Sequence, residues 1–405
     1  MPDPLVHRMD VNHNPIKIIT IGVMGGGQLG RMLAHAAQRL GMRVVVLDPQ
    51  LECPAAQAAD HHIQAAYDDN DALDELARIC DAITTEFENV PAPSLLRLAQ
   101  SKPVRPSAKA VAIAQDRLEE KLFFQQQGID TARFWALERH LAESAQEALD
   151  RCREAVFPAI LKTRRLGYDG KGQLPVESFE QLASAWDELS QVACLLEERL
   201  SLRFELSVIL VRDQTGQVAV YPAIENRHRN GILERSDFPA PRDREVTEKA
   251  RDLAAQVASG LDYEGVLCLE FFVVGQTDDP SGWRLLANEM APRPHNSGHV
   301  TIDACAVSQF EQQARVLAGL PMGDCEAKSK ACLLNLLGDH WFDQQGRWRE
   351  PDWQRLLAIE GLHLHLYGKR QAKPGRKMGH ISVCATSQST LDERVAYVIS
   401  LLERS

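Results

Sequence analysis

The chain has 405 residues, of which 44% are hydrophobic and 25% are charged. This composition is typical of a folded enzyme with two or three domains, and it excludes a disordered chain. The formal net charge of −11 excludes a general electrostatic attraction to nucleic acid or to an anionic membrane. An anionic ligand must therefore be held by a local group of cations and hydrogen-bond donors.

The cysteines and the apolar runs indicate the compartment. Nine cysteines are scattered singly and form no CxxC pair, which favours reduced, mostly buried thiols in a cytoplasmic protein. No apolar run is long enough to cross a bilayer. Residues 1–15 lack the apolar core of a signal peptide and are interpreted as an N-terminal extension.

The first part of the chain alternates strand and helix patterns. The expected elements are strands at 16–23, 43–47 and 82–85 and helices at 28–40 and 71–79. Because a β-α-β-α-β order brings successive strands side by side in one direction, it predicts a parallel sheet. We assign residues 16–128 to this doubly wound α/β domain.

A different pattern follows. Strands are expected at 157–162, 194–198, 205–211, 218–221, 265–274 and 284–290, with one helix at 245–261. This antiparallel α+β layout predicts a second domain over residues 129–325. Residues 326–405, with strands at 331–337, 363–367 and 380–384, form a small β-rich domain that must pack on the others, because so short a segment buries little core alone.

A glycine turn follows the first expected strand. Residues 25–30 read Gly-Gly-Gly-Gln-Leu-Gly and open a helix, and Asp48 ends the next strand. This is the context of a dinucleotide-binding fingerprint, in which the acid would bind a ribose hydroxyl. A tight turn that only packs helix on strand has the same pattern, so an NAD-dependent oxidoreductase is one alternative among others.

A second glycine-rich loop, residues 164–173, comes directly after a strand ending in Lys162. It contains three glycines and three cations, and main-chain N–H groups together with cations suit a polyphosphate. The loop has no GK[ST] and is not a Walker loop. A charged hairpin turn is the structural alternative.

Two acids flank the next turn. Glu270 and Glu289 lie on the strands on either side of residues 275–283, so antiparallel pairing would bring them nearly opposite one another. Facing carboxylates repel unless a cation separates them. With Asn288 they offer the hard oxygen ligands that Mg²⁺ shares with substrate phosphates. Surface acids are the alternative, but both acids lie in apolar runs.

Polar side chains gather on the segment that follows. Residues 291–299 read Ala-Pro-Arg-Pro-His-Asn-Ser-Gly-His. Arg293, His295 and Asn296 would suit a planar oxyanion such as bicarbonate. Earlier in the chain, Glu86 follows a parallel strand at the sheet edge where ligands bind, and could accept hydrogen bonds from sugar hydroxyls.

The C-terminal part contains a basic turn. Five cations occur within nine residues of this acidic chain: Lys369, Arg370, Lys373, Arg376 and Lys377. They could hold a phosphate monoester, or they could form a solvated turn. His363 and His365, on the strand before the turn, are interpreted as packing residues and not as metal ligands.

In their order along the chain, these motifs resemble the 5-(carboxyamino)imidazole ribonucleotide synthase family of ATP-grasp enzymes. The matching segments are GGGQLGRM at 25–32, TTEFENVP at 84–91, LGYDGKGQ at 166–173, ENRHRNGIL at 225–233, NEMAPRPHNSGH at 288–299 and PGRK at 374–377. The likeness covers residues 16–384, and its most specific parts are APRPHNSGH at 291–299 and the basic turn with PGRK at 374–377.

The resemblance implies an architecture and an activity. The expected fold has a doubly wound N-terminal domain, a central ATP-grasp domain and a small C-terminal domain. The expected reaction carboxylates the amine of 5-aminoimidazole ribonucleotide with ATP and bicarbonate, through carboxyphosphate, in purine biosynthesis. Mg²⁺ is the implied cofactor. A cytoplasmic homodimer is also implied, with no nucleic acid or membrane partner.

The resemblance also implies a role for each matching residue. The ATP ligands would be Arg117, Lys162, Gly167, Tyr168, Asp169, Gly170, Lys171, Gly172, Gln173, Glu197, Glu198, Arg199, Leu200, Glu205, Asn226, His228, Asn288 and Glu289. The ribonucleotide ligands would be Gln28, Leu29, Glu86, Lys369, Arg376 and Lys377. Residues 197–200 would form the hinge that reads adenine, and Glu270 and Glu289 would bind Mg²⁺. The catalytic residues would be Asp169, Arg293, His295, Asn296 and Lys369, with Asp169 accepting a proton and the next three holding bicarbonate.

Three alternatives to this interpretation remain. One is another ATP-grasp ligase, such as a formate-using transformylase or a biotin carboxylase; the PGRK turn argues against the biotin carboxylase more strongly than against the transformylase. The second is the NAD-dependent oxidoreductase, which leaves the second glycine loop and the acid pair unexplained. The third is a nucleotide-binding regulatory module without activity.

Overall fold

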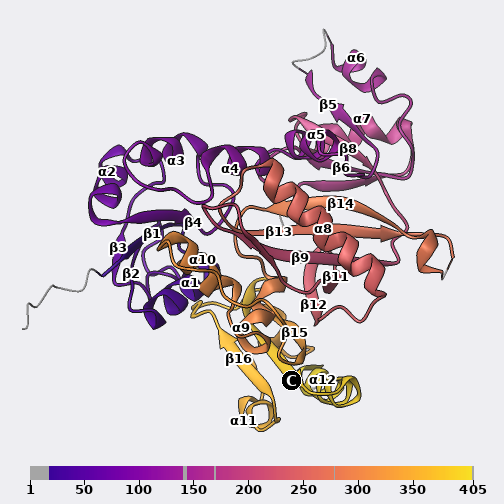
Figure 1. Ribbon diagram of the computed structural model, residues 1–405. Helices are drawn as coiled ribbons and strands as arrows, with labels where there is room; N and C mark the ends of the chain where they lie inside the picture. The colour runs from indigo at the N-terminus through magenta and orange to yellow at the C-terminus, as the bar shows by residue number, and fades with distance from the viewer. Residues whose placement is uncertain (1–17, 140–143, 168–169, 278, 404–405) are drawn as a thin grey trace, which may run out of the picture.

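The computed structural model describes residues 18–139, 144–167, 170–277 and 279–403. Within these residues the strands form three sheets: a parallel sheet near the N-terminus, a small antiparallel sheet, and a large sheet that runs into the C-terminal part (Figure 1). The fold class expected from the sequence, α/β followed by α+β, is confirmed.

The N-terminal sheet is parallel throughout. Its strands are β1 (Thr20–Met24), β2 (Arg43–Leu47), β3 (His61–Ile63) and β4 (Ala82–Thr85), in the order β3-β2-β1-β4. The three expected strands are found, although β1 begins at Thr20 and leaves Ile18 and Ile19 before it. The short strand β3 was not predicted, because His61-His62-Ile63 has no apolar run to mark it.

Helices cover both faces of this sheet. The helices of this part are α1 (Gln28–Arg39), α2 (Asn70–Ile79), α3 (Ala92–Ala99), α4 (Ala108–Ala114) and α5 (Arg117–Gln126). On one face α1 packs with α10 (Gln309–Leu317), which comes from a distant part of the chain, through Leu33 and Phe310. This packing joins the N-terminal sheet to the rest of the molecule.

The small sheet, with its two helices, forms what we call the small lobe (residues 134–198). Its elements are β5 (Phe134–Leu137), α6 (Ala145–Asp150), β6 (Ala159–Thr163), β7 (Gln173–Val176), α7 (Phe179–Glu188) and β8 (Cys194–Glu198). The sheet is antiparallel, in the order β5-β8-β6-β7. Leu161, Trp186 and Leu196 lie in its separate core.

The large sheet spans the central and C-terminal parts. Its strands are β9 (Phe204–Arg212), β10 (Val218–Val220), β11 (Ile224–Arg229), β12 (Ile232–Phe238), β13 (Gly265–Val274), β14 (Arg284–Ala291), β15 (Lys330–Leu337), β16 (Leu362–Leu366) and β17 (Lys377–Ala385). They run β14-β13-β9-β11-β12-β15-β17-β16, with β10 paired to β9. The β12–β15 ladder therefore joins the C-terminal strands to the central sheet.

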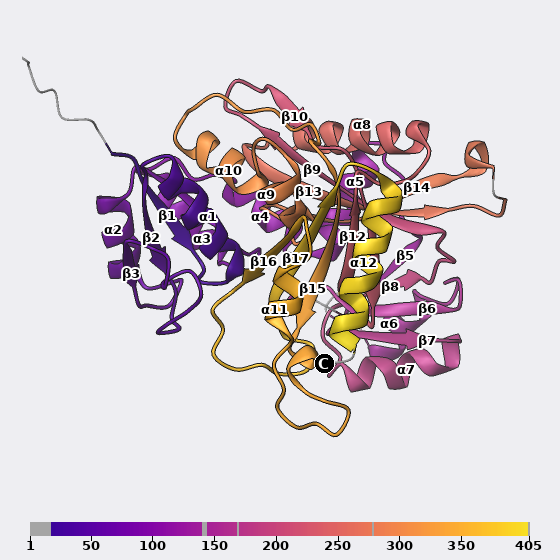
Figure 2. The same cartoon turned by 90° about the horizontal axis from the view of Figure 1, so that it is seen from below.

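Helices flank this sheet as well (Figure 2). They are α8 (Arg244–Gly260), α9 (Thr301–Ala304), α11 (Trp353–Leu357) and α12 (Gln388–Glu403), with the 3-10 helices η2 (Pro280–Gly282), η3 (Ser297–Val300) and η4 (Gly338–Trp341). β13 is buried along most of its length because α8 packs on one face and the α9–α10 region on the other. This explains the nearly continuous apolar run in its sequence.

All nine cysteines are free, and eight of them are buried, as the scattered pattern predicted. A search of the helices in the described ranges finds none with the length and apolar character needed to cross a membrane.

Candidate active site

A cavity of about 410 Å³ lies where the small lobe faces β13, β14 and the segment after β14. It brings together side chains from five of the six motifs noted in the sequence. Its lining includes Glu88, Asn89, Gln115, Arg117, Glu120, Lys162, Arg164, Gly167, Gly170, Gln173, Glu205, His228, Glu270, Asn288, Glu289, Arg293, His295, Asn296 and Lys377. Most of the residues expected to bind ATP, metal or bicarbonate therefore line this cavity.

The acid pair lies at a β-bulge. The β13–β14 ladder pairs Leu269 with Met290 and Phe271 with Ala287, so Glu270 faces two residues, Asn288 and Glu289. In such a bulge, two successive residues of one strand, here Asn288 and Glu289, lie opposite a single residue of the other strand. The predicted proximity of Glu270 and Glu289 is thus achieved through a bulge, which the sequence did not reveal.

The electrostatics at the bulge favour a cation. Burial, and then the charge of Glu289, raise the pKa of Glu270 to about 8, while a hydrogen bond from Asn288 opposes the shift. A divalent ion held by the carboxylates would remove this repulsion. Within the described ranges no cluster of three or more His, Cys, Asp and Glu side chains suits a metal, so an ion here would need further oxygen ligands from a substrate.

Arg117, at the first turn of α5, links the acid pair to the second glycine loop. Its Nη1 donates to Glu289 Oε2 at 3.0 Å, and its Nη2 donates to Gly167 O at 3.5 Å. Next to it, Glu120 accepts the Met290 N–H at 2.7 Å. Burial and then the charge of Glu289 raise the pKa of Glu120 to about 8. No pattern in the sequence marks Glu120, which is one acid on a polar helix.

Glu197 holds two lysines. Its carboxylate lies 2.5 Å from Lys162 Nζ and 2.9 Å from Lys121 Nζ, and its side chain is 3% exposed. Burial opposes ionisation, but Lys121 and Lys162 outweigh it and lower the pKa of Glu197 to about 2. Glu197 was expected to read adenine. Its side chain instead fixes Lys162 at the cavity wall.

The neighbouring hinge side chains point to the surface. Glu198 pairs with Arg133 at 2.8 Å, and Arg199 pairs with Glu177 at 2.8 Å. These partners turn both side chains away from the cavity, and Leu200 does not line it. None of residues 197–200 lines the cavity, and adenine recognition by this segment stays a prediction.

The second glycine loop borders the cavity through Gly167, Gly170 and Gln173, while Lys171 is exposed. Arg164 anchors its beginning by donating to Asp116 at 2.8 Å. Two expected loop residues, Tyr168 and Asp169, lie outside the described residues. Gly172, also expected to hold ATP, has a φ of 70°, a left-handed conformation that suits glycine.

The expected bicarbonate residues lie together, and two of them, Arg293 and His295, already contact carboxylates of the protein. Arg293 forms an ion pair with Glu88 at 2.7 Å, a partner the sequence did not suggest. His295 Nε2 lies 3.3 Å from Glu270 Oε1. Burial and then the charge of Arg293 hold the pKa of His295 well below its usual value, so the ring is neutral. Asn296 lies on the same wall.

Glu205 and His228, which both line the cavity, form an ion pair of 2.9 Å. Burial alone would lower the pKa of His228, but Glu205 and Glu270 outweigh it and raise the pKa. Asn226, expected near the nucleotide, is 3% exposed and does not line the cavity. It pairs across the strands with Glu205 and Ser236, so it shares the sheet face of Glu205, but its side chain is bonded to Ser207 and Ser236 beneath the cavity lining. Its expected contact with ATP stays a prediction.

Comparison with known proteins decides the family. The ATP-grasp domain model matches residues 122–310, the ribonucleotide synthetase preATP-grasp domain model residues 18–115, and the phosphoribosylaminoimidazole carboxylase C-terminal domain model residues 331–394. The N5-carboxyaminoimidazole ribonucleotide synthase of Brucella melitensis is 44% identical, over 90% of this chain and 95% of the relative. That of Bacillus subtilis is 40% identical, over 89% and 90%.

The chain belongs to the N5-carboxyaminoimidazole ribonucleotide synthase family. Solved structures agree. A synthetase in complex with ADP is 35% identical and has a TM-score of 0.85, covering 95% of this chain and 98% of that chain. The synthase of Aspergillus clavatus with ADP and 5-aminoimidazole ribonucleotide is 30% identical and has a TM-score of 0.84, covering 96% and 99%.

Membership of the synthase family confirms three predictions: the ATP-grasp architecture, an ATP-dependent ligase that forms a C–N bond, and the carboxylation of 5-aminoimidazole ribonucleotide in purine biosynthesis. The oxidoreductase and the inactive regulatory module are thereby wrong.

The first glycine turn explains why the dinucleotide interpretation fails in this synthase. Gly26 N–H donates to Asp48 Oδ2 at 2.7 Å, and Gly27 N–H and Gly30 N–H donate to Glu86 at 2.8 and 3.1 Å. Tyr67 O–H also donates to Asp48, at 2.6 Å. The donors that would bind a pyrophosphate are therefore occupied by the protein's own carboxylates.

Only some of the residues expected to bind the ribonucleotide have side chains placed for contact with a substrate. Lys369 Nζ donates to Gln28 Oε1 at 3.0 Å and to Lys377 O at 2.7 Å, which ties the basic turn to α1. Leu29 is 8% exposed and belongs to the N-terminal core, so a contact with substrate is not supported. Glu86 contacts Gly27 and Gly30, as described above.

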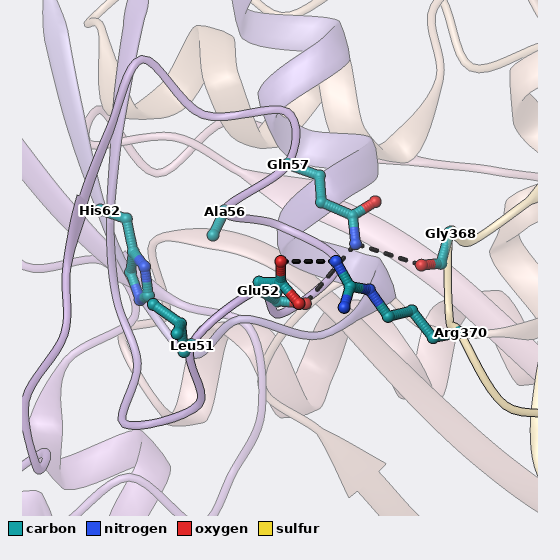
Figure 3. A pocket seen from close by; sticks show the side chains of 7 residues that line it. All are labelled: Leu51, Glu52, Ala56, Gln57, His62, Gly368 and Arg370. Carbon is teal, nitrogen blue, oxygen red and sulfur yellow. Dashed lines mark hydrogen bonds and ion pairs between the residues drawn. The ribbon is translucent and has the colours of Figure 1, made fainter.

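Two adjoining cavities lie where residues 50–57 of the N-terminal part meet the basic turn. One, of about 380 Å³, is lined by Lys369 and Arg376. In the other (Figure 3), of about 490 Å³, Arg370 pairs with Glu52 and Gln57 Nε2 donates to Gly368 O at 3.1 Å. The expected phosphate cations therefore lie between the first and last parts of the chain.

Proposed function

We propose that ATP, bicarbonate and 5-aminoimidazole ribonucleotide meet in the cavity between the small lobe and the β13–β14 bulge. The observation that carries this proposal is the placement of Glu270 and Glu289 across the bulge, with His295 3.3 Å from Glu270. A cation site and an oxyanion site then share one wall, as transfer of a phosphoryl group to bicarbonate requires.

The triphosphate end is assigned to the side of the small lobe. Lys162, held by Glu197, and Arg117, held by Glu289, both line the cavity beside Gly167. When Mg²⁺ is bound, it would offset charge on the transferring phosphoryl group. Glu270 and Glu289 would hold it, with Asn288 beside them, because this all-oxygen set fits a hard cation.

Bicarbonate is assigned to Arg293, His295 and Asn296. In the reaction, a bicarbonate oxygen attacks the γ-phosphorus, and the bond to ADP breaks to give carboxyphosphate. The substrate amine then forms the C–N bond, inorganic phosphate leaves, and the amine loses a proton. A closed cavity protects carboxyphosphate from water. Asp169 as the proton acceptor stays a prediction, since it lies outside the described residues.

The ribonucleotide is assigned to the opposite side, where Gln28 and the basic turn meet. Lys369, Arg376 and Lys377 supply cations for its phosphate, and Lys377 also lines the main cavity. Because Lys377 follows Arg376 directly and lines the main cavity, it supports a phosphate position next to the proposed carboxylation site. A homodimer is part of the proposal, and light scattering after size-exclusion chromatography would test it.

The decisive experiment measures ADP release with each substrate omitted in turn. Rapid release should need ATP, Mg²⁺, bicarbonate and 5-aminoimidazole ribonucleotide together, with only slow release when the ribonucleotide is absent. A formate-using transformylase would instead depend on formate. Release that is equally fast without bicarbonate would refute the proposal.

A further inference from the structure

A line of buried polar side chains runs from β12 to His295. Ser236 Oγ donates to Asn226 Oδ1 at 2.8 Å, and Asn226 Nδ2 donates to Ser207 Oγ at 2.9 Å. The hydroxyls of Ser207 and Ser297 lie 2.7 Å apart, and Ser297 Oγ lies 2.9 Å from His295 Nδ1. The three serines are 0% exposed, so solvent does not compete with these bonds.

The line has a direction. Each hydroxyl donates one proton. Because Ser207 accepts from Asn226, its own proton goes to Ser297. The proton of Ser297 has two neighbours, His295 Nδ1 at 2.9 Å and the Cys268 thiol, and it goes to Nδ1 because sulfur is the weaker acceptor. The side-chain amide alone does not establish this direction, since a flipped amide would reverse every bond.

The main chain decides between the two directions. Ser297 N–H lies 3.4 Å from His295 Nδ1, and a main-chain N–H can only donate. Nδ1 is therefore an acceptor, and the proton of the neutral ring is on Nε2. The reversed line would place an Nδ1–H against this N–H.

The main chain of His295 is also held by hydrogen bonds. Its N–H donates to Gln309 Oε1 at 2.9 Å, and its carbonyl accepts from Gln309 Nε2 at 2.7 Å. With the main chain and Nδ1 both fixed, Nε2–H has one direction, toward the cavity and Glu270 Oε1.

We propose that the line Ser236–Asn226–Ser207–Ser297 holds His295 as the Nε2–H tautomer, so that it donates a hydrogen bond to an oxygen of bicarbonate or of carboxyphosphate. Asn226, Ser207 and Ser297 are positioning residues for this donor. In this tautomer Nε2 has no lone pair facing the cavity, so His295 neither accepts the proton of the substrate amine nor binds a metal there. The oxyanion rests on the proposed function, but the tautomer does not.

Nuclear magnetic resonance of the full chain labelled with ¹⁵N-histidine tests the tautomer directly. Long-range ¹H–¹⁵N correlations distinguish the protonated ring nitrogen from the bare one, and His295→Asn identifies the signals of His295. The expected result is a protonated Nε2. A protonated Nδ1 in the unmodified protein would overturn the proposal.

Asn226→Asp is the most informative variant because aspartate has the shape of asparagine, but its carboxylate can only accept hydrogen bonds. Ser207 must then donate to residue 226, every later bond reverses, and the proton is expected on Nδ1. The matched control is Ser236→Ala, which shortens the line at its far end and should leave the proton on Nε2. An Asn226→Asp protein with Nε2 still protonated would refute the line. If this variant does not fold, Ser297→Ala should show a mixture of tautomers, and an unchanged spectrum would refute the proposal equally.

Kinetics supply the second readout. Asn226→Asp should raise KM for bicarbonate about tenfold, the effect of one buried hydrogen bond, and leave KM for ATP unchanged. An equal rise in both constants, with the tautomer unchanged, would show that Asn226 acts only through the fold. Failure of the proposed function would look different: the unmodified protein would show no bicarbonate-dependent turnover while its His295 spectrum still showed Nε2–H.

Discussion

The carboxylate of Glu86 accepts the N–H of Gly27 at 2.8 Å and that of Gly30 at 3.1 Å. A carboxylate from the end of β4 thus takes the place at the N-terminus of α1 that a bound anion would otherwise occupy. The negative charge is favourable there because the helix dipole and the free N–H groups are both directed at it. The glycines serve this internal contact.

Gly27→Ala is expected to destabilise the protein by about 1–3 kcal/mol, because an added Cβ overpacks the site. That Cβ would lie 2.4 Å from Glu86 Oε1. The free energy of unfolding in urea measures the effect. Gly282→Ala is the control, since its nearest neighbour would be Thr277 Oγ1 at 3.3 Å. Equal stability of the two variants would contradict this account of the turn.

NADH is expected not to bind. Asp48, the acid that would contact a ribose, is already bonded to Gly26 N–H and Tyr67 O–H. A fluorescence titration of the protein with NADH should show no saturation, whereas ADP with Mg²⁺ should raise the thermal unfolding temperature. Saturable NADH binding that ADP does not displace would reopen the dinucleotide interpretation.

Glu289→Ala is expected to lower kcat by about 10²–10³-fold, the size typical for the loss of one electrostatic contact to the reacting groups. The change removes both the partner of Arg117 and one proposed Mg²⁺ ligand. Steady-state ADP release measures it, and thermal unfolding shows whether the fold persists. Glu248→Ala removes an acid paired with Arg251 on α8, away from the cavity, and should keep normal turnover. Near-normal turnover of Glu289→Ala would refute the metal assignment.

Glu120→Gln is expected to make stability less dependent on pH. The folded-state pKa of Glu120 is raised to about 8 by burial and Glu289. Between about pH 4.5 and 8 the folded chain therefore retains a proton that the unfolded chain loses. Stability falls as pH rises through this window, by roughly 1 kcal/mol per pH unit.

The glutamine keeps the acceptor for Met290 N–H and removes this proton. The test compares the unfolding temperatures of Glu120→Gln and the unmodified protein at pH 5.5 and at pH 8 without metal. The advantage of the variant should be greater at pH 8. A constant difference across this range would mean that Glu120 is ionised in the folded protein.

Lys369→Ala is expected to raise KM for the ribonucleotide about tenfold or more, because a charge-assisted contact with the phosphate is lost. KM for ATP should stay unchanged, since Lys369 lies at the junction with Gln28 and not beside the small lobe. Lys373→Ala, which removes an exposed cation of the same turn, is the matched control. A selective effect of Lys369→Ala on ATP would place the phosphate site elsewhere.

Much of the architecture could be predicted because periodicity and glycine boundaries report local structure. The helix expected at 28–40 is α1, which ends before Gly41 with φ 74°. The strands around 265–274 and 284–290 are β13 and β14. The boundaries differ by a residue or two, since strand ends depend on the pairing partner as well as on the sequence.

Side-chain partners from distant segments could not be predicted. Glu197 looked like part of an adenine hinge until Lys121 and Lys162 were seen to share it. Glu88 had no expected role, because its partner Arg293 lies more than two hundred positions away in the sequence. Asn226 matched a nucleotide motif, yet its side chain is hydrogen-bonded to Ser207 and Ser236. In each case the sequence defined the residue type, while tertiary packing selected the direction of the side chain.

The β12–β15 ladder has a mechanical consequence. Because Arg235 pairs with Leu334 and Phe238 with Ala331, Glu270 on β13 and Lys377 on β17 are parts of one hydrogen-bonded plate. Such a plate resists shear, so the proposed cation ligands and the proposed phosphate-binding turn should keep a constant separation, which would select substrates by their length. The small lobe has its own core and its own sheet. Ion pairs of Glu197 with Lys121 and of Arg164 with Asp116 join this lobe to α5, so its position over the cavity depends on side-chain contacts and not on the large sheet.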